Sequence, residues 1–145
     1  MLLTRQDTPV ITSKKNTDGV SKGAYIIREA SLDAGLTLIA TVSEVAFACQ
    51  AAERIESDLN SGVRVVSMPC MERFERQYTE YQKSVIDPDV PSISIEAGST
   101  FGWNKWADFP IGINSFGASA PGDIAMSKFG ITVQAAIEAA TNILS

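Results

Sequence analysis

One stretch of the chain limits its fold more than any other: a short apolar run, then a helical pattern, then a second apolar run. Residues 36–40 are almost continuously apolar, which is typical of a strand buried on both faces of a parallel sheet. Apolar residues then recur at helical spacing from Val45 to Leu59, and residues 63–68 form the next strand-like run. The pattern therefore predicts two parallel strands joined by a right-handed helical crossover.

Both ends of this predicted helix carry boundary signals. Ser43 is expected to cap its start, because the hydroxyl can accept a hydrogen bond from a free N–H of the first turn. Glu44 suits the positive end of the helix dipole, and Asn60-Ser61-Gly62 is expected to end the helix.

The rest of the chain alternates in the same way. Further strands are expected at residues 24–28, 92–96 and 111–113, and helical patterns run over residues 74–85, 121–129 and from a Thr132 cap onward. We therefore predict an α/β three-layer sandwich, with a mainly parallel sheet of about five strands and helices on both faces. Residues 25–28 are the candidate antiparallel edge strand. Residues 1–22 are polar and turn-rich, and we expect them to form an extended N-terminal segment.

The chain contains no histidine, and this restricts its chemistry. Ser-His-Asp and Cys-His nucleophile arrangements are excluded, as is the commonest metal ligand. The two cysteines, Cys49 and Cys70, have neither CxxC nor zinc-site spacing. Cys49 lies on an apolar helical stripe and is interpreted as a core residue. Cys70 follows Pro69 at a strand end. A reactive thiol there remains an alternative interpretation, although no histidine is present to lower its pKa.

Charge and hydropathy exclude two kinds of partner. The net charge is −5 and the basic residues are scattered, which argues against a nucleic-acid partner. No apolar run approaches the roughly 18 residues of a membrane span. The first residues lack a signal-peptide pattern, so a cytoplasmic location is expected.

Three loops follow predicted strands, at residues 41–44, 96–103 and 116–121, where open α/β sheets usually place ligands. None matches GxGxxG or a P-loop, although free N–H groups in such a turn can hold an anion. Glu96 ends a buried strand and is either a base or, as we favour, a carboxylate that binds loop N–H groups.

Two further features leave alternatives open. Trp103 and Trp106 lie near Phe101 and Phe109, and such a cluster lines a pocket or an interface, or covers one end of the domain's own core. Arg5 lies in the N-terminal segment. By itself it is a surface charge, although a guanidinium can clamp a phosphate with two parallel hydrogen bonds.

Several segments together resemble one family. They are Leu3-Thr4-Arg5-Gln6, Ile39-Ala40-Thr41-Val42-Ser43-Glu44-Val45, Val63-Arg64-Val65-Val66-Ser67-Met68-Pro69, Glu96-Ala97-Gly98-Ser99-Thr100-Phe101-Gly102-Trp103 and Phe116-Gly117-Ala118-Ser119-Ala120-Pro121. In this order they resemble successive motifs of the transketolase C-terminal domain, over nearly the whole chain. Related thiamine enzymes, such as deoxyxylulose phosphate synthase, share the fold but lack this run. Val42 departs from the pattern, because the family usually has Gly there; Asn104 stands at a variable position.

The resemblance implies a function for a larger enzyme. Transketolases transfer a two-carbon ketol unit between sugar phosphates, use thiamine diphosphate with magnesium or calcium, and act as homodimers. Residues 23–145 would be the C-terminal domain, and residues 1–22 would lead in from the preceding domain. Arg5 matches the family's arginine that contacts the sugar phosphate.

The resemblance also implies what this piece lacks. The family's thiamine site needs a Gly-Asp-Gly motif, whereas Gly122-Asp123 is followed here by Ile124. We therefore expect a fragment without catalytic, cofactor-binding or metal residues of its own, which works with the remaining domains and a second subunit. The alternatives are a free-standing module that binds an anion or nucleotide, and a small enzyme that uses Glu96 or Cys70.

Overall fold

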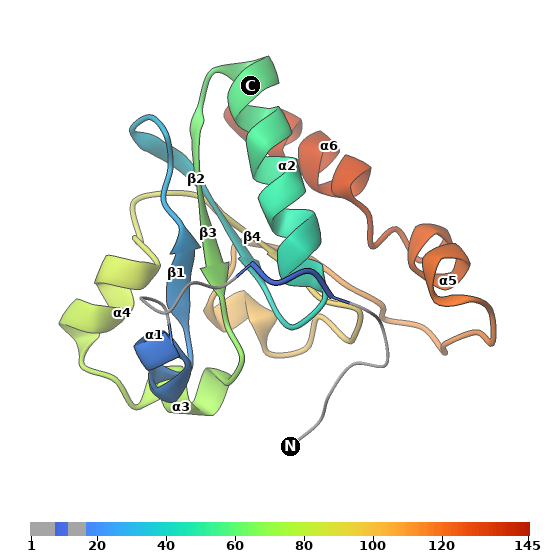
Figure 1. Ribbon diagram of the computed structural model, residues 1–145, viewed down its shortest axis with the longest axis horizontal. Coiled ribbons are helices and arrows are strands. Elements are labelled where there is room, and N and C mark those ends of the chain that lie inside the picture. The colour runs from blue at the N-terminus through green and yellow to red at the C-terminus, as the bar shows by residue number, and fades with distance from the viewer. Residues whose placement is uncertain (1–7, 12–16) are drawn as a thin grey trace.

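The computed structural model describes residues 8–11 and 17–145. Its centre is a five-stranded sheet in the order β1-β3-β2-β4-β5 (Figure 1). The strands are β1 (Tyr25–Arg28), β2 (Ala34–Ala40), β3 (Gly62–Ser67), β4 (Ser92–Ile95) and β5 (Phe109–Ile111). Strand β1 pairs antiparallel with β3, and the other three pairings are parallel. The predicted sheet and its antiparallel edge strand are confirmed.

Helices cover both faces of this sheet. They are α1 (Thr17–Lys22), α2 (Glu44–Leu59), α3 (Met71–Glu75), α4 (Thr79–Val85), the 3₁₀ helix η2 (Trp103–Lys105), α5 (Gly122–Lys128) and α6 (Val133–Leu144). Figure 1 shows α2 and α6 on one side of the sheet and α3 and α4 on the other. The predicted three-layer sandwich is therefore confirmed.

The central strands are buried on both faces, as the continuous apolar run predicted. Leu36 and Leu38 of β2 are fully buried in the cluster under α2 and α6. Ile39 points the other way, into a second cluster with Phe74 and Val85. Alternate residues of one strand thus fill two separate cores, each of these side chains contributing about 1.5–3 kcal/mol by its burial.

The helix ends differ in part from expectation. Ser43 does not cap α2: it has helical angles (φ −71°, ψ −32°), and its hydroxyl donates to the Glu44 carboxylate at 3.1 Å. Asn60 ends α2 in the left-handed conformation, a conformation that Asn tolerates. Thr132 is a true cap of α6, because its hydroxyl accepts a hydrogen bond from the N–H of Ala135.

The expectation of an extended segment is wrong for residues 17–22, which form helix α1. The hydroxyl of Ser21 donates to the carbonyl of Asp18 at 2.7 Å and closes the short helix. Gly19 leaves the space that the Tyr25 ring occupies, since a Cβ there would lie 2.3 Å from the Cβ of Tyr25. Turn-forming residues here therefore build a helical turn against β1.

The helical pattern over residues 74–85 proves to be two helices, α3 and α4. Tyr78 between them is extended (φ −60°, ψ 146°) and 85 % exposed, so it does not join the apolar stripe. The side-chain amide of Gln82 donates to the carbonyls of Phe74 and Glu75, both at 3.0 Å. The amide thus satisfies two carbonyls at the C-terminal end of α3 and stabilises the break between α3 and α4. The last strand also begins and ends two residues before its predicted position.

Candidate functional site

The carboxyl ends of β2 and β4 are the place where this topology favours a ligand. The two strands are neighbours, but the chain leaves β2 toward β3 on one side and leaves β4 toward β5 on the other. Open α/β sheets bind ligands outside such a switch point. The structure brings Thr41, Glu44 and Glu96 together there.

Glu96 is held by the neighbouring turn. Its carboxylate accepts a hydrogen bond from the hydroxyl of Thr41, and both side chains are half-buried. The partner is thus a hydroxyl in the turn after β2, not the loop N–H groups that the sequence suggested. The contact joins the loops that follow β2 and β4.

Glu44 is the residue that sequence reasoning undervalued. It is only 3 % exposed, whereas a helix-dipole role would leave it at the surface. Burial raises the pKa of this carboxyl, and the nearby charge of Glu96 raises it further. The hydroxyl of Ser43 and backbone N–H groups, including that of Ala97, act in the opposite direction. The signal available in the sequence was a glutamate only four residues after the end of a buried strand, at the start of the predicted helix.

Val42 occupies the turn between these groups. Its φ is +41°, in the left-handed region, and its side chain is 54 % exposed. A β-branched residue there is a true outlier, at a cost of roughly 1–2 kcal/mol. The position that departs from the resembled pattern therefore keeps a backbone that suits glycine.

The aromatic cluster divides between core and surface. Trp103 is 2 % exposed and lies in the second core cluster, and the Trp106 ring lies 4.8 Å from that of Phe74. Phe101, in contrast, is 94 % exposed. The tryptophans thus cover the domain's own core, and only part of the loop remains available to a partner.

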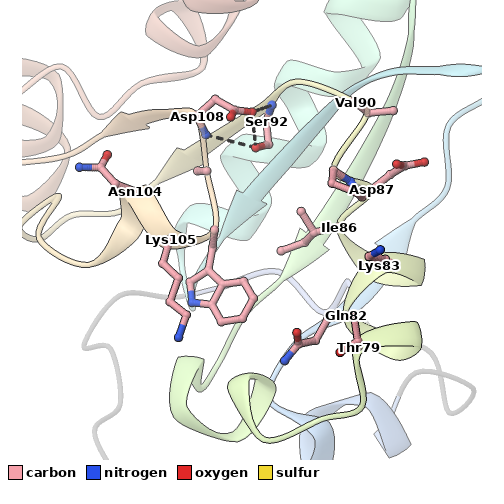
Figure 2. Close-up of a pocket in the computed structure, with 13 residues that line it drawn as sticks. Thr79, Gln82, Lys83, Ile86, Asp87, Val90, Ser92, Asn104, Lys105 and Asp108 are labelled. Atoms are coloured by element: carbon pink, nitrogen blue, oxygen red, sulfur yellow. Dashed lines mark hydrogen bonds between the residues drawn. The ribbon is translucent and has the colours of Figure 1, made fainter.

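Figure 2 shows a pocket of about 320 Å³ between α4, the segment that follows it, and the η2 region. The Asp108 carboxylate accepts the N–H and the hydroxyl of Ser92, both at 2.9 Å, and Ser92 Oγ accepts the N–H of Asp108. Lys105 pairs with Glu75. These groups bind one another, and the pocket lies at the amino end of β4, opposite Glu96.

A second cavity, of about 390 Å³, lies at the carboxyl edge itself. Residues 8–11 line it together with Val42, Ser43 and Pro69. The first described residues of the chain therefore lie against this edge. Arg5, the predicted substrate-binding residue, lies outside the described residues.

The two cysteines lie in different surroundings. Cys49 packs half-buried against the first core, and burial raises the pKa of its thiol. The Sγ of Cys70 lies 3.5 Å from a carboxylate oxygen of Glu72. Within residues 8–11 and 17–145, no three His, Cys, Asp or Glu side chains are grouped so as to hold a metal. None of the described helices is long and apolar enough to span a bilayer.

The fold and its edge define an α/β domain with loops gathered at the carboxyl ends of a mainly parallel sheet. The family model described as the transketolase-like C-terminal domain matches residues 23–132. The chain belongs to the transketolase family and forms its C-terminal domain. This finding favours the family interpretation over a free-standing module or a small independent enzyme.

Known proteins agree with this assignment. The transketolase of Staphylococcus epidermidis is 45 % identical over 138 residues, which are 91 % of this chain and 21 % of that protein. The structure of Leishmania mexicana transketolase matches with a TM-score of 0.82 and 38 % identity, over 88 % of this chain and 18 % of that one. A Pichia stipitis transketolase complexed with sedoheptulose 7-phosphate matches with a TM-score of 0.81 and 34 % identity, over the same shares. The chain spans about a fifth of the length of these relatives.

Proposed function

We propose that this domain works within an intact transketolase, where it supports subunit packing and contributes Arg5 to the binding of the sugar phosphate. The observation that carries the proposal is the match to family members over 91 % of this chain but only 21 % of their length. The remaining domains would hold thiamine diphosphate and its magnesium or calcium ion. The intact enzyme would transfer two-carbon units between sugar phosphates as a cytoplasmic homodimer.

Support for the role of Arg5 comes from chemistry and from a relative. The Pichia stipitis protein was crystallised with a sugar phosphate. A guanidinium binds a phosphate with two parallel charge-assisted hydrogen bonds, a geometry that a lysine cannot reproduce. Residues 8–11, which follow Arg5 closely in the sequence, line the cavity at the carboxyl edge.

The test is Arg5→Ala in the intact enzyme, assayed with phosphorylated and unphosphorylated ketose donors. Loss of hydrogen bonds to a charged group costs about 1.5–3 kcal/mol, so kcat/KM for the phosphorylated donor is expected to fall about 10- to 150-fold. The unphosphorylated donor should be used as well as before. Arg54→Ala, at an exposed position of α2, serves as the control. An unchanged kcat/KM for phosphorylated donors, with KM also unchanged, would remove Arg5 from the site.

A further inference from the structure

The pocket at the amino end of β4 is bounded by three segments that lie far apart in the sequence. Figure 2 shows side chains of α4 on one side, side chains of the η2 region on the other, and Ser92 with Asp108 at one end. Its volume of about 320 Å³ lies at the lower end of the range of small-molecule sites. The pocket therefore has room for a ligand the size of a single ring.

Two oxygen acceptors in this pocket are fixed by hydrogen bonds of their neighbouring atoms. The N–H and the hydroxyl of Ser92 both donate to Oδ2 of Asp108, at 2.9 Å each, so Oδ1 remains for a ligand. The amide nitrogen of Gln82 donates to the carbonyls of Phe74 and Glu75, both at 3.0 Å, which leaves its Oε1 as an acceptor. Acceptors that are oriented in advance bind a donor with little loss of entropy.

The lining also includes apolar surface. Ile86, Val90 and Trp106 contribute to it. The ring of Trp106 is held from within the domain by Phe74, whose ring centroid lies 4.8 Å away. An indole offers a broad apolar face against which the C–H bonds of a ring can pack. A matching ligand therefore needs an apolar face as well as polar edges.

The charges of the lining disfavour a ligand with a charge of its own. Lys83 and Lys105 contribute ammonium groups, and Asp87 and Asp108 contribute carboxylates. A phosphate drawn to the lysines would also meet the carboxylates, and an ammonium drawn to the carboxylates would meet the lysines. A hydroxyl group donates to a carboxylate and accepts from an ammonium without bringing a charge. The lining thus suits a neutral ligand with several hydroxyl groups.

We propose that this pocket binds one neutral sugar ring, which carries hydroxyl groups along its edge and C–H bonds on its faces. Ring hydroxyls donate to Asp108 Oδ1 and Gln82 Oε1, while a C–H face packs on Trp106. The inference is independent of the role proposed for Arg5, because none of the groups that it uses lies in the N-terminal segment.

The test titrates the intact enzyme, labelled with ¹³C in its isoleucine methyl groups, with methyl β-D-xylopyranoside. The methyl group locks this sugar as a ring and leaves no free carbonyl for a transfer reaction. The NMR signal of Ile86, identified by its loss in Ile86→Val, should shift and saturate with a dissociation constant of about 1 mM. The signal of Ile124, 55 % exposed on α5, should stay unchanged. No shift at Ile86 up to about 20 mM, or equal shifts at both positions, overturns the proposal.

Competing probes test the chemistry of the ligand. Inorganic phosphate offers a charge without a ring, and cyclohexylammonium offers a ring with a cation in place of hydroxyl groups. Neither should displace the xyloside at equal concentration, because each brings a charge toward like charges of the lining. Displacement by either probe contradicts the assignment to a neutral sugar.

A matched pair of variants tests the acceptor. Asp108→Asn keeps one oxygen for the hydrogen bonds from Ser92 and replaces the other with an N–H donor. The intact variant should therefore bind the xyloside about tenfold more weakly. Asp58→Asn makes the same chemical change at an exposed position of α2, on the other side of the sheet, and should leave the affinity unchanged. Equal affinities in the two variants would remove Asp108 from the site and overturn the proposal.

Discussion

The two ends of helix α2 place similar residues in opposite environments. Each end has a carboxylate, Glu44 in the first turn and Glu56 in the last. A residue with positive φ lies just outside each end, Val42 before the helix and Asn60 after it. The helix dipole by itself would lower the pKa of Glu44 and raise that of Glu56. The reverse is found, since the pKa of Glu44 is raised and that of Glu56 is held well below its usual range.

Specific contacts explain the reversal. Glu56 pairs with Arg28 at 2.5 Å and accepts hydrogen bonds from the backbone N–H groups of Val63 and Ser31. Glu44 has no cation among its described partners and lies near a second carboxylate, Glu96. Direct hydrogen bonds and burial therefore outweigh the dipole. The contacts of Glu56 stabilise the folded domain, whereas the burial of Glu44 without a cation destabilises it.

The largest expected change in the free energy of unfolding is at the C-terminal end of α2, where Glu56 lies. Glu56→Ala leaves Arg28 and the N–H of Val63 without their partner, and we expect the free energy of unfolding to fall by about 2–4 kcal/mol. Asp58→Ala, at an exposed position of the same helix, should change it by less than about 0.5 kcal/mol. Urea unfolding at neutral pH measures both. Equal effects of the two substitutions would show that the Glu56 contacts contribute nothing special.

The same contacts set a pH dependence. Because the folded-state pKa of Glu56 is lowered, its contribution is present above the unfolded-state pKa of about 4.3 and is lost as pH falls through the folded-state value. The stability difference between the wild type and Glu56→Ala should therefore shrink in acid. A difference that stays constant down to about pH 2 would contradict the ion pair as its source.

At the other end, Glu44→Gln should stabilise the domain. The folded-state pKa of Glu44 is raised, so the folded chain retains its proton over a range where the unfolded chain has lost it. Stability consequently falls as pH rises above about 4.3, and the amide escapes this loss. We expect a gain of about 0.5–2 kcal/mol at pH 7 and none at pH 3, measured by thermal unfolding. A gain of equal size at both values would assign the effect to packing.

The sequence predicted the sheet, its edge strand and the helix layers, because each depends on a local apolar period. It did not predict the burial of Glu44 or the hydroxyl partner of Glu96, since both depend on which loops meet at the switch point. The division of the aromatic cluster was equally hidden: Trp103 and Phe101 are two residues apart, and only tertiary packing decides which of them is buried. Helix α1 was missed because Gly19 and Asp18 are typical of turns.

The smallest expected effect compares the two residues with positive φ. Val42 (φ +41°) precedes α2 and Asn60 (φ +50°) ends it. Asn adopts this region readily, whereas a β-branched side chain is strained there by roughly 1–2 kcal/mol. Glycine relieves that strain but loses more chain entropy on folding, so Val42→Gly should stabilise by about 0.5–1 kcal/mol and Asn60→Gly by nearly nothing. Chemical unfolding of the two variants measures both effects. A destabilised Val42→Gly domain would show that the valine side chain contributes more by packing than its backbone costs.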